Sequence, residues 1–264
     1  MDAVTLTEAL SAAHLSWYVE GATHDRGGIM LVAPAGSLKT SITEVTDSYG
    51  KTLVISDLTI RQAAQLRGDM LSGKLATLAF SDFAKLYARH EATAANIEGF
   101  IRGIVGEGYR NVNWEDARAV ALPAHCLVLG CMTSNFYTNK FGQWCEDGFA
   151  RRFLWCHFTL SRKGSMAITH ALSRGKRLQI GAANGFDAKV PIQPIPENVT
   201  DREAAQLLLW IKGQPDDKIQ IVLLRKMLTA LKWKYKKDPK KPMKILAEFA
   251  MSLRKEGTEL EIVE

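Results

Sequence analysis

The stretch IMLVAPAGSLKT, residues 29–40, decides the expected fold. Its first four residues are all apolar, without alternation, which is typical of a short strand buried on both faces. A loop of small residues follows, and residues 40–48 carry the pattern of a helix. We therefore expect a strand, a tight loop and a helix, a unit from which parallel sheets covered by helices are built.

The loop of this unit has the chemistry of a phosphate-binding loop. Its backbone N–H groups attract an anion, a lysine adds positive charge, and the next hydroxyl reaches Mg²⁺. The motif G-x-x-x-x-G-K-[ST] has glycine where this chain has Ala33 and Leu38, whereas Gly36, Lys39 and Thr40 stay in register. We predict that the loop binds a nucleotide through a run of eight residues: Pro34, Ala35, Gly36, Ser37, Leu38, Lys39, Thr40 and Ser41.

The departure at Leu38 has a structural consequence. The residue before the lysine often needs a backbone shape that glycine tolerates best, so we expect a slightly rearranged loop. The alternative interpretation is a surface turn whose lysine is merely solvated. That alternative leaves the strand, loop and helix context unexplained.

Three further apolar runs, residues 52–55, 75–80 and 126–132, alternate with helical patterns. Polar side chains follow the ends of these runs, namely Asp57, Asp82 and Asn135. In a parallel sheet, ligands bind at the carboxyl ends of the strands. The sequence therefore predicts an α/β fold with a mostly parallel sheet covered by helices and a single nucleotide site.

Residues 29–158 resemble the ATPase core of AAA+ and RecA-like motors, and are especially similar to phage-encoded ATPases distantly similar to minichromosome maintenance helicases. APAGSLKT (33–40) matches the Walker A position and LATLAFSD (75–82) the Walker B strand. VLGCMTSN (128–135) matches the sensor strand, and DGFARRF (147–153) matches the segment that carries an arginine finger. The resemblance implies a P-loop NTPase that binds ATP and Mg²⁺.

The resemblance also implies a role for each matching residue. Lys39 would contact the phosphates, Thr40 and Asp82 would hold the metal with its water, and Asn135 would contact the γ-phosphate. Arg151 or Arg152 would reach the γ-phosphate of a neighbouring subunit, which implies a homo-oligomeric ring, with a hexamer most expected. The alternative interpretations assign no functional role: Asp82 would be a strand-end cap, Asn135 a turn residue, and the two arginines a solvated pair.

The residue that would orient the attacking water is not identified. In the family a glutamate follows the Walker B aspartate, but this chain has Phe83 there. Glu91, Glu98, Glu107 or Asp57 could supply a carboxylate, and the sequence does not select among them. ATP binding is therefore predicted more firmly than ATP hydrolysis.

Composition separates the C-terminal part from the rest. Residues 181–200 contain three prolines and two glycines and are predicted to be a linker between residues 1–180, the P-loop domain with an N-terminal helix, and residues 201–264. The last segment has three helical patterns and a final alternating run, which favours a small winged-helix-like domain; a lid of helices fits almost equally well.

This segment is also basic. Residues 225–244 hold nine basic residues and one acidic residue, in a chain with net charge +6. Lysines interleaved with aromatic rings favour phosphate contacts combined with base stacking, whereas the alternative is a solvated helix end with a core tryptophan. The residues predicted to bind DNA are Lys232, Trp233, Lys234, Lys236, Lys237, Lys240 and Lys241.

Other classes are less favoured. The four cysteines have no CxxC spacing, which argues against zinc, and no apolar run is long enough to span a membrane, so we expect a cytoplasmic protein without membrane contact. The leading hypothesis is an ATP-dependent DNA motor or DNA-remodelling ATPase. The alternative is a nucleotide-switched helicase loader or DNA-binding protein with weak or no hydrolysis. A metabolic kinase would leave the basic segment and DGFARRF without a role.

Overall fold

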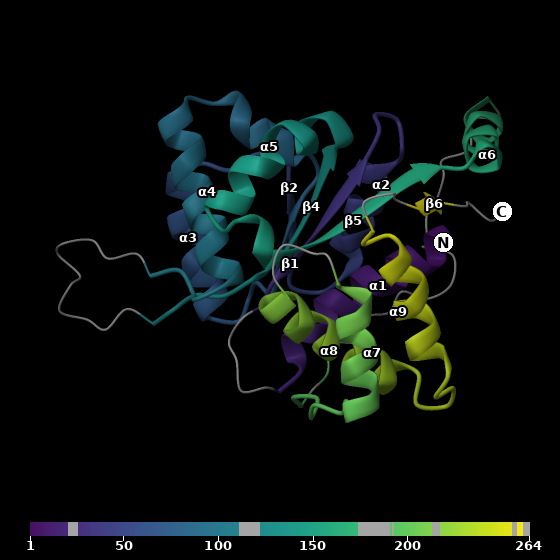
Figure 1. Cartoon of the computed structure of the whole chain (residues 1–264). Helices are drawn as coiled ribbons and strands as arrows, with labels where there is room; N and C mark the ends of the chain where they lie inside the picture. Colours follow the sequence, from purple (N-terminus) through teal and green to yellow (C-terminus); the bar gives the residue numbers. More distant parts are fainter. Residues whose placement is uncertain are drawn as a thin grey trace.

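The computed structural model describes residues 1–20, 26–110, 122–173, 191, 193–212, 217–254 and 258–260. The described strands form one parallel sheet in the order β2-β3-β4-β1-β5-β6 (Figure 1). Their bounds are β1 Gly28–Ala33, β2 Thr52–Ile55, β3 Thr77–Phe80, β4 Leu127–Thr133, β5 Phe153–Leu160 and β6 Thr258–Leu260. The expected parallel α/β architecture is confirmed.

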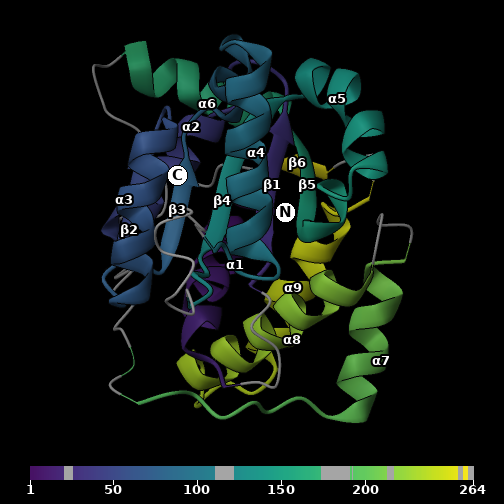
Figure 2. The same cartoon turned by 90° about the vertical axis from the view of Figure 1, so that its left-hand side faces the viewer.

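Helices cover both faces of this sheet (Figures 1 and 2). One face carries α1 (Ala3–Leu15), α2 (Lys39–Val45), α7 (Asp201–Trp210), α8 (Asp217–Lys234) and α9 (Lys241–Met251). The other face carries α3 (Ile60–Leu71), α4 (Glu91–Val105) and α5 (Ser134–Glu146). Short 3₁₀ helices connect these elements: η1 Ser16–Tyr18, η2 Thr46–Ser48, η3 Phe83–Ala88 and η4 Ala150–Arg152.

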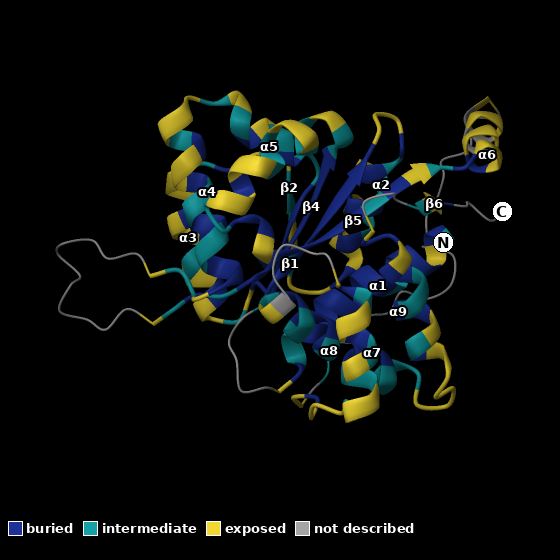
Figure 3. Ribbon diagram, viewed as in Figure 1, coloured by how far each residue is buried: buried dark blue, intermediate teal, exposed yellow. Residues whose placement is uncertain are grey.

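The central strands are apolar on both sides because both sides are covered. Along β1, Ile29 and Leu31 point to the face of α1, α8 and α9, whereas Met30 and Val32 point to the face of α3, α4 and α5. Every residue of β1 is buried. Figure 3 shows the strands in the buried colour and the outer helix surfaces exposed. Continuous apolar runs, rather than alternating ones, are what a doubly covered parallel sheet requires.

Local sequence sets where several helices begin. Thr59 and Gln62 form a capping box at the start of α3, and Thr200 and Glu203 form another at the start of α7. Asp2 caps α1 by accepting from the backbone N–H of Thr5. Such caps satisfy backbone donors that have no partner within the helix and typically contribute about 1 kcal/mol each.

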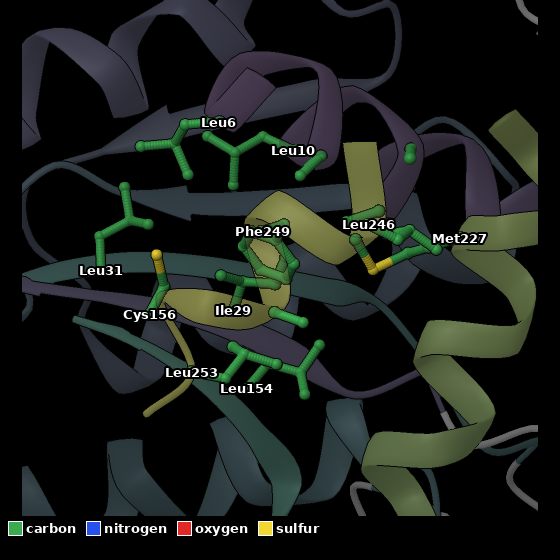
Figure 4. Packing of buried hydrophobic residues seen from close by; sticks show 14 of the residues in the cluster. Leu6, Leu10, Ile29, Leu31, Leu154, Cys156, Met227, Leu246, Phe249 and Leu253 are labelled. Carbon is green, nitrogen blue, oxygen red and sulfur yellow. The ribbon is translucent and has the colours of Figure 1, made fainter. Parts of the chain in front are cut away.

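The C-terminal segment shares its core with the sheet. Phe249 of α9 and Met227 of α8 belong to the same buried cluster as Ile29 of β1 and Leu154 of β5 (Figure 4). Strand β6 extends the sheet, because Thr258 pairs in parallel with Phe158 of β5. We expected residues 201–264 to form a separate winged-helix-like domain, and this arrangement stays a prediction. In the described residues, the apolar faces of these helices are buried against α1 and the sheet.

The predicted linker lies partly outside the described residues. In its described part, Ile195 is buried and pairs with Val19 in an isolated parallel bridge. Helix α6 (Arg162–Ser173) follows β5 and stands apart from the other helices in Figure 1. Its Met166 side chain is 64% exposed. None of the helices in the described part of the chain is long and apolar enough to cross a membrane.

Candidate functional site

The loop between β1 and α2, residues 34–38, leaves the sheet at the carboxyl edge, the edge where all the parallel strands end. Ala33, the last residue of β1, lies beside Thr133 of β4. Gly36 has φ 76°, and Leu38 has φ 58° and ψ 15°, which is the left-handed region. Leu38 thus has the backbone shape that glycine tolerates best, while the slightly rearranged loop stays a prediction.

Lys39 turns back over the loop. Its Nζ donates a hydrogen bond to the carbonyl oxygen of Pro34 at 2.6 Å, and its side chain is largely buried. Burial lowers the pKa of Lys39, while the nearby Cys131 and Asp82 act in the opposite direction. The ammonium is therefore held at the mouth of a loop whose residues Pro34 to Gly36 are exposed to solvent.

Thr40 and Asp82 meet at the same edge. The Oγ1 of Thr40 donates to the carbonyl oxygen of Ser81 at 3.3 Å, which brings the start of α2 against the end of β3. Asp82 follows directly and accepts from the backbone N–H of Ala84 at 3.2 Å. The residues predicted as the Walker A lysine, its hydroxyl neighbour and the Walker B aspartate thus lie together.

Cys131 is a residue of this site that sequence reasoning missed. Its Sγ donates to the same Ser81 carbonyl at 2.7 Å, and burial raises the pKa of its thiol to about 11. It reaches this position because β4 lies between β1 and β3 in the sheet. The cysteine spacing argued only against zinc, and no signal in the sequence reveals that β4 lies between the strand before the loop and the strand before Asp82.

These groups suit Mg²⁺ bound to a nucleotide. Magnesium keeps several waters and is usually held by one or two protein ligands together with phosphate oxygens. Thr40 supplies a hydroxyl and Asp82 a carboxylate at the same edge. Within the described ranges no group of three or more His, Cys, Asp or Glu side chains could form an all-protein metal cage. The donor set therefore fits a metal that arrives with phosphate ligands.

Asn135 lies one residue into α5 and is exposed. Thr133 is the residue of β4 that lies beside Ala33, and its side chain caps α5 by accepting from the N–H of Phe136. The carboxyl edge thus includes Asn135, but Thr133 lies nearer to the start of the loop.

The carboxylates considered for the attacking water differ in their surroundings. Asp57 is paired with Arg89, which holds the pKa of Asp57 below its usual value. Glu98 accepts from the Tyr87 hydroxyl at 2.6 Å, on the face of α3, α4 and α5. Glu107 contacts Arg152 beyond the end of α4. Glu91 is exposed at the start of α4, and Phe83 after Asp82 is fully buried.

Arg151 and Arg152 precede β5 and therefore lie at the amino edge, the opposite edge of the sheet. Phe153 pairs with Gly28, the first residue of β1. Arg152 is 7% exposed, and its Nη1 donates to the carbonyl oxygen of Gly148 at 2.5 Å. Arg151 is exposed. Neither arginine belongs to the loop site of its own subunit, and only Arg151 is oriented toward the surface.

The basic segment divides into two groups of side chains. Lys232 forms an ion pair with Glu203 at 2.7 Å, and Lys234 forms one with Glu8 at 2.8 Å. Trp233 packs on the cluster around Leu15. Four lysines at the connection between α8 and α9 are exposed, and we call them the basic loop: Lys236, Lys237, Lys240 and Lys241.

The basic loop lies at the end of the molecule opposite the β1–α2 loop (Figures 1 and 2). The end of α8 lies near the end of α1, through Trp233 and Leu15. The end of α1 lies at the amino edge, because His14 Nδ1 is 2.9 Å from Oγ1 of Thr77, the first residue of β3.

Comparison with known proteins does not assign this chain to a family. No protein-family profile matches it, and no curated protein is significantly similar to it.

Proposed function

We propose that this chain is an ATP-binding P-loop protein that acts on DNA. The observation that carries the proposal is the position of Lys39, whose ammonium closes the loop onto Pro34 while Thr40 and Asp82 lie at the same edge. An ammonium held by a single backbone carbonyl can exchange that partner for a phosphate oxygen, which is a stronger acceptor.

Each residue of the site has a role in this proposal. Lys39 neutralises phosphate charge, and the exposed residues Pro34 to Gly36 leave that side of the loop open. Thr40 and Asp82 hold Mg²⁺ with its water, and the metal supplies charge stabilisation to the phosphate groups. Cys131 holds the Ser81 carbonyl that also accepts from Thr40, and so fixes the approach of Asp82.

The DNA part of the proposal rests on the basic loop. Four exposed lysines at one connection form a surface suited to phosphate contacts. The preceding residues hold the end of α8 in place: Lys232 and Lys234 are paired with carboxylates, and Trp233 packs on the cluster around Leu15.

The homo-oligomeric ring of this proposal rests on the resemblance and on the exposure of Arg151. Under this proposal Arg151 is the arginine that acts on a neighbouring subunit, because it is exposed whereas Arg152 is buried against Gly148. Assembly into a homo-oligomer, with six subunits expected from the resemblance, would place the amino edge of one subunit near the carboxyl edge of the next.

A nucleotide-controlled DNA-binding protein with little hydrolysis is the second candidate. Phe83 occupies the position after Asp82 and is 0% exposed, packed with aromatic rings such as Phe80 and Trp144. No carboxylate can come from that position. For the motor hypothesis, Glu91 at the start of α4 is one exposed candidate beside Asp57 and Glu107.

The test begins with binding of a fluorescent ATP analogue in Mg²⁺ by the natural chain, Lys39→Ala and the exposed control Lys74→Ala. We expect Lys39→Ala to lose roughly 10- to 100-fold in affinity, the effect of removing a charged hydrogen-bond donor, and Lys74→Ala to bind normally. Equal binding by all three would contradict the nucleotide site.

Turnover then separates the two candidates. DNA-stimulated ATP hydrolysis that Lys39→Ala abolishes would support the ATPase, whereas tight ATP binding without turnover would support the switch. Sedimentation with and without nucleotide tests the ring, and a chain that stays monomeric under both conditions would remove the role of Arg151.

A further inference from the structure

A pocket with aromatic walls lies at the amino edge, away from the proposed nucleotide site. Its volume is about 360 Å³, and its lining includes Trp17, Tyr18, Glu20, Lys51, Pro191 and Pro194. Lys51 directly precedes β2, so the pocket opens where the strands begin. The volume falls within the range of small-molecule sites and is large enough for one nucleobase.

Backbone pairing fixes the walls of the pocket. The N–H of Ile195 donates to the carbonyl of Tyr18 at 2.8 Å, and the N–H of Glu20 donates to the carbonyl of Ile195 at 2.9 Å. This pairing places Pro194 beside Tyr18. The two aromatic side chains therefore project from a segment that is anchored to another segment far along the chain.

Cations accompany both rings. The Arg26 guanidinium lies 4.4 Å from the centroid of the Trp17 ring, and Lys51 Nζ lies 5.8 Å from that of Tyr18. Lys51 is exposed and has φ 63°, an uncommon conformation for a residue with a side chain. Of these two cations Lys51 lines the pocket and Arg26 does not. Aromatic walls beside a cation suit a flat ring that carries a phosphate.

The pocket and the basic loop are linked through a shared buried cluster. Tyr18 and Trp233 pack on the same buried cluster, which includes Leu15 and Val19. Lys236 Nζ in turn lies 5.9 Å from the centroid of the Trp233 ring. One small cluster therefore supports both a wall of the pocket and the tryptophan beside the first lysine of the basic loop.

We propose that the pocket takes one unstacked base of a single-stranded nucleic acid whose phosphates lie along the basic loop. This inference deepens the proposed function and rests on its DNA part, not on ATP binding. A base in a duplex is stacked on both faces and paired at its edge, so it cannot enter the pocket. The site therefore selects single strands, by stacking rather than by reading sequence.

The first experiment compares three ligands on the full chain without nucleotide, by fluorescence anisotropy. The ligands are a labelled oligothymidylate, an abasic oligomer of equal length and a duplex. We expect the oligothymidylate to bind about tenfold more tightly than the abasic strand, a modest effect for stacking of one base, and more tightly than the duplex. Equal affinities for the abasic and natural strands would overturn the base pocket.

Variants then locate the site. Lys51→Glu and Trp17→Leu should each weaken the oligothymidylate severalfold and narrow its advantage over the abasic strand. Lys85→Glu, an exposed lysine beyond the carboxyl end of β3, serves as the matched control and should change neither. Thermal unfolding checks that each variant remains folded.

Photocrosslinking of the natural chain to a 5-iododeoxyuridine strand needs no substitution. Crosslinks at Trp17 or Tyr18 are expected, and crosslinks confined to other surfaces would overturn the inference. Loss of ATP binding with intact single-strand binding would contradict only the nucleotide site. ATP binding without any nucleic-acid binding would contradict this inference.

Discussion

The two edges of the sheet differ in how they present positive charge. At the carboxyl edge, Lys39 is largely buried and bonded to a carbonyl of its own loop, where Asp82 lies nearby. At the amino edge, the lysines of the basic loop are exposed, with aromatic rings near them. A buried cation in a fixed geometry suits a small anion of defined shape, whereas exposed cations on flexible stems suit a polymer of phosphates.

This contrast teaches that a lysine count alone does not locate a site. Lys232 and Lys234 are part of the same basic run as Lys236, yet they are committed to carboxylates within the fold. Under the proposal, a substitution at one edge of the sheet should therefore leave the function of the other edge unchanged.

The largest effect is expected from removing the charge of the basic loop. The variant replaces four lysines by glutamine: Lys236, Lys237, Lys240 and Lys241. If each lysine contacts one phosphate, the slope of log K for single-strand binding against log salt concentration should become shallower by about 2.8. If both chains bind single strands equally at 1 M salt, this change of slope makes the variant bind roughly 600-fold more weakly than the natural chain at 0.1 M salt. ATP affinity should not change, and a parallel loss of ATP binding would show that the two edges are not independent.

A pH effect on stability is expected from His14 at the amino edge. Burial, reinforced by nearby Lys51, lowers the pKa of His14 from 6.5 to about 4. Above pH 6.5 the imidazole is neutral in both states; as the pH falls toward 4, the unfolded chain gains a proton that the folded chain does not. The free energy of unfolding should therefore fall by up to about 3 kcal/mol over this range.

Urea unfolding at pH 7 and pH 4.5 measures this change, and His14→Gln supplies the comparison. Other groups also titrate in this range, so the quantity of interest is the difference between the two chains. If the natural chain and the variant lose the same stability on acidification, His14 is not the group responsible.

The two arginines before β5 should separate into a structural and a surface residue. Arg152→Ala removes a buried guanidinium that donates to Gly148 and contacts Gly106, and should lower the free energy of unfolding by about 2 kcal/mol. Arg151→Ala should change it by less than about 0.5 kcal/mol. Denaturant unfolding checks both values, and an Arg152→Ala chain of full stability but without turnover would reassign the trans role to Arg152.

The smallest effect is expected at Leu38. Leu38→Gly relieves a left-handed conformation that costs a side-chain residue about 1 kcal/mol, but it also removes a partly buried contact with the core and increases the freedom of the unfolded chain. We expect a net change within about 1 kcal/mol and unimpaired ATP binding. Lys51→Gly, at the other left-handed residue, is the matched control at the amino edge. A loss above 2 kcal/mol at Leu38 would mean that its packing dominates.

Much of the sheet could be predicted because its signals are local. Continuous apolar runs mark β1, β3 and β4, and polar residues mark the edge where they end. The left-handed conformation of Leu38 has a similarly local cause, since the residue before the lysine lies in a tight loop. The packing of the C-terminal helices could not be predicted in this way, because the apolar faces of α8 and α9 are visible in the sequence but the surface that covers them is not.

Local patterns were enough to predict β1 to β4 and to place Lys39, Thr40 and Asp82 after strand ends, because burial and loop chemistry act over a few residues. Only the tertiary structure placed β4 between β1 and β3, which brings Cys131 to the Ser81 carbonyl. It also separated the exposed lysines from the paired ones and packed Tyr18 and Trp233 on one buried cluster. These outcomes depend on contacts between residues far apart in the chain, and the packing of the whole core decides them.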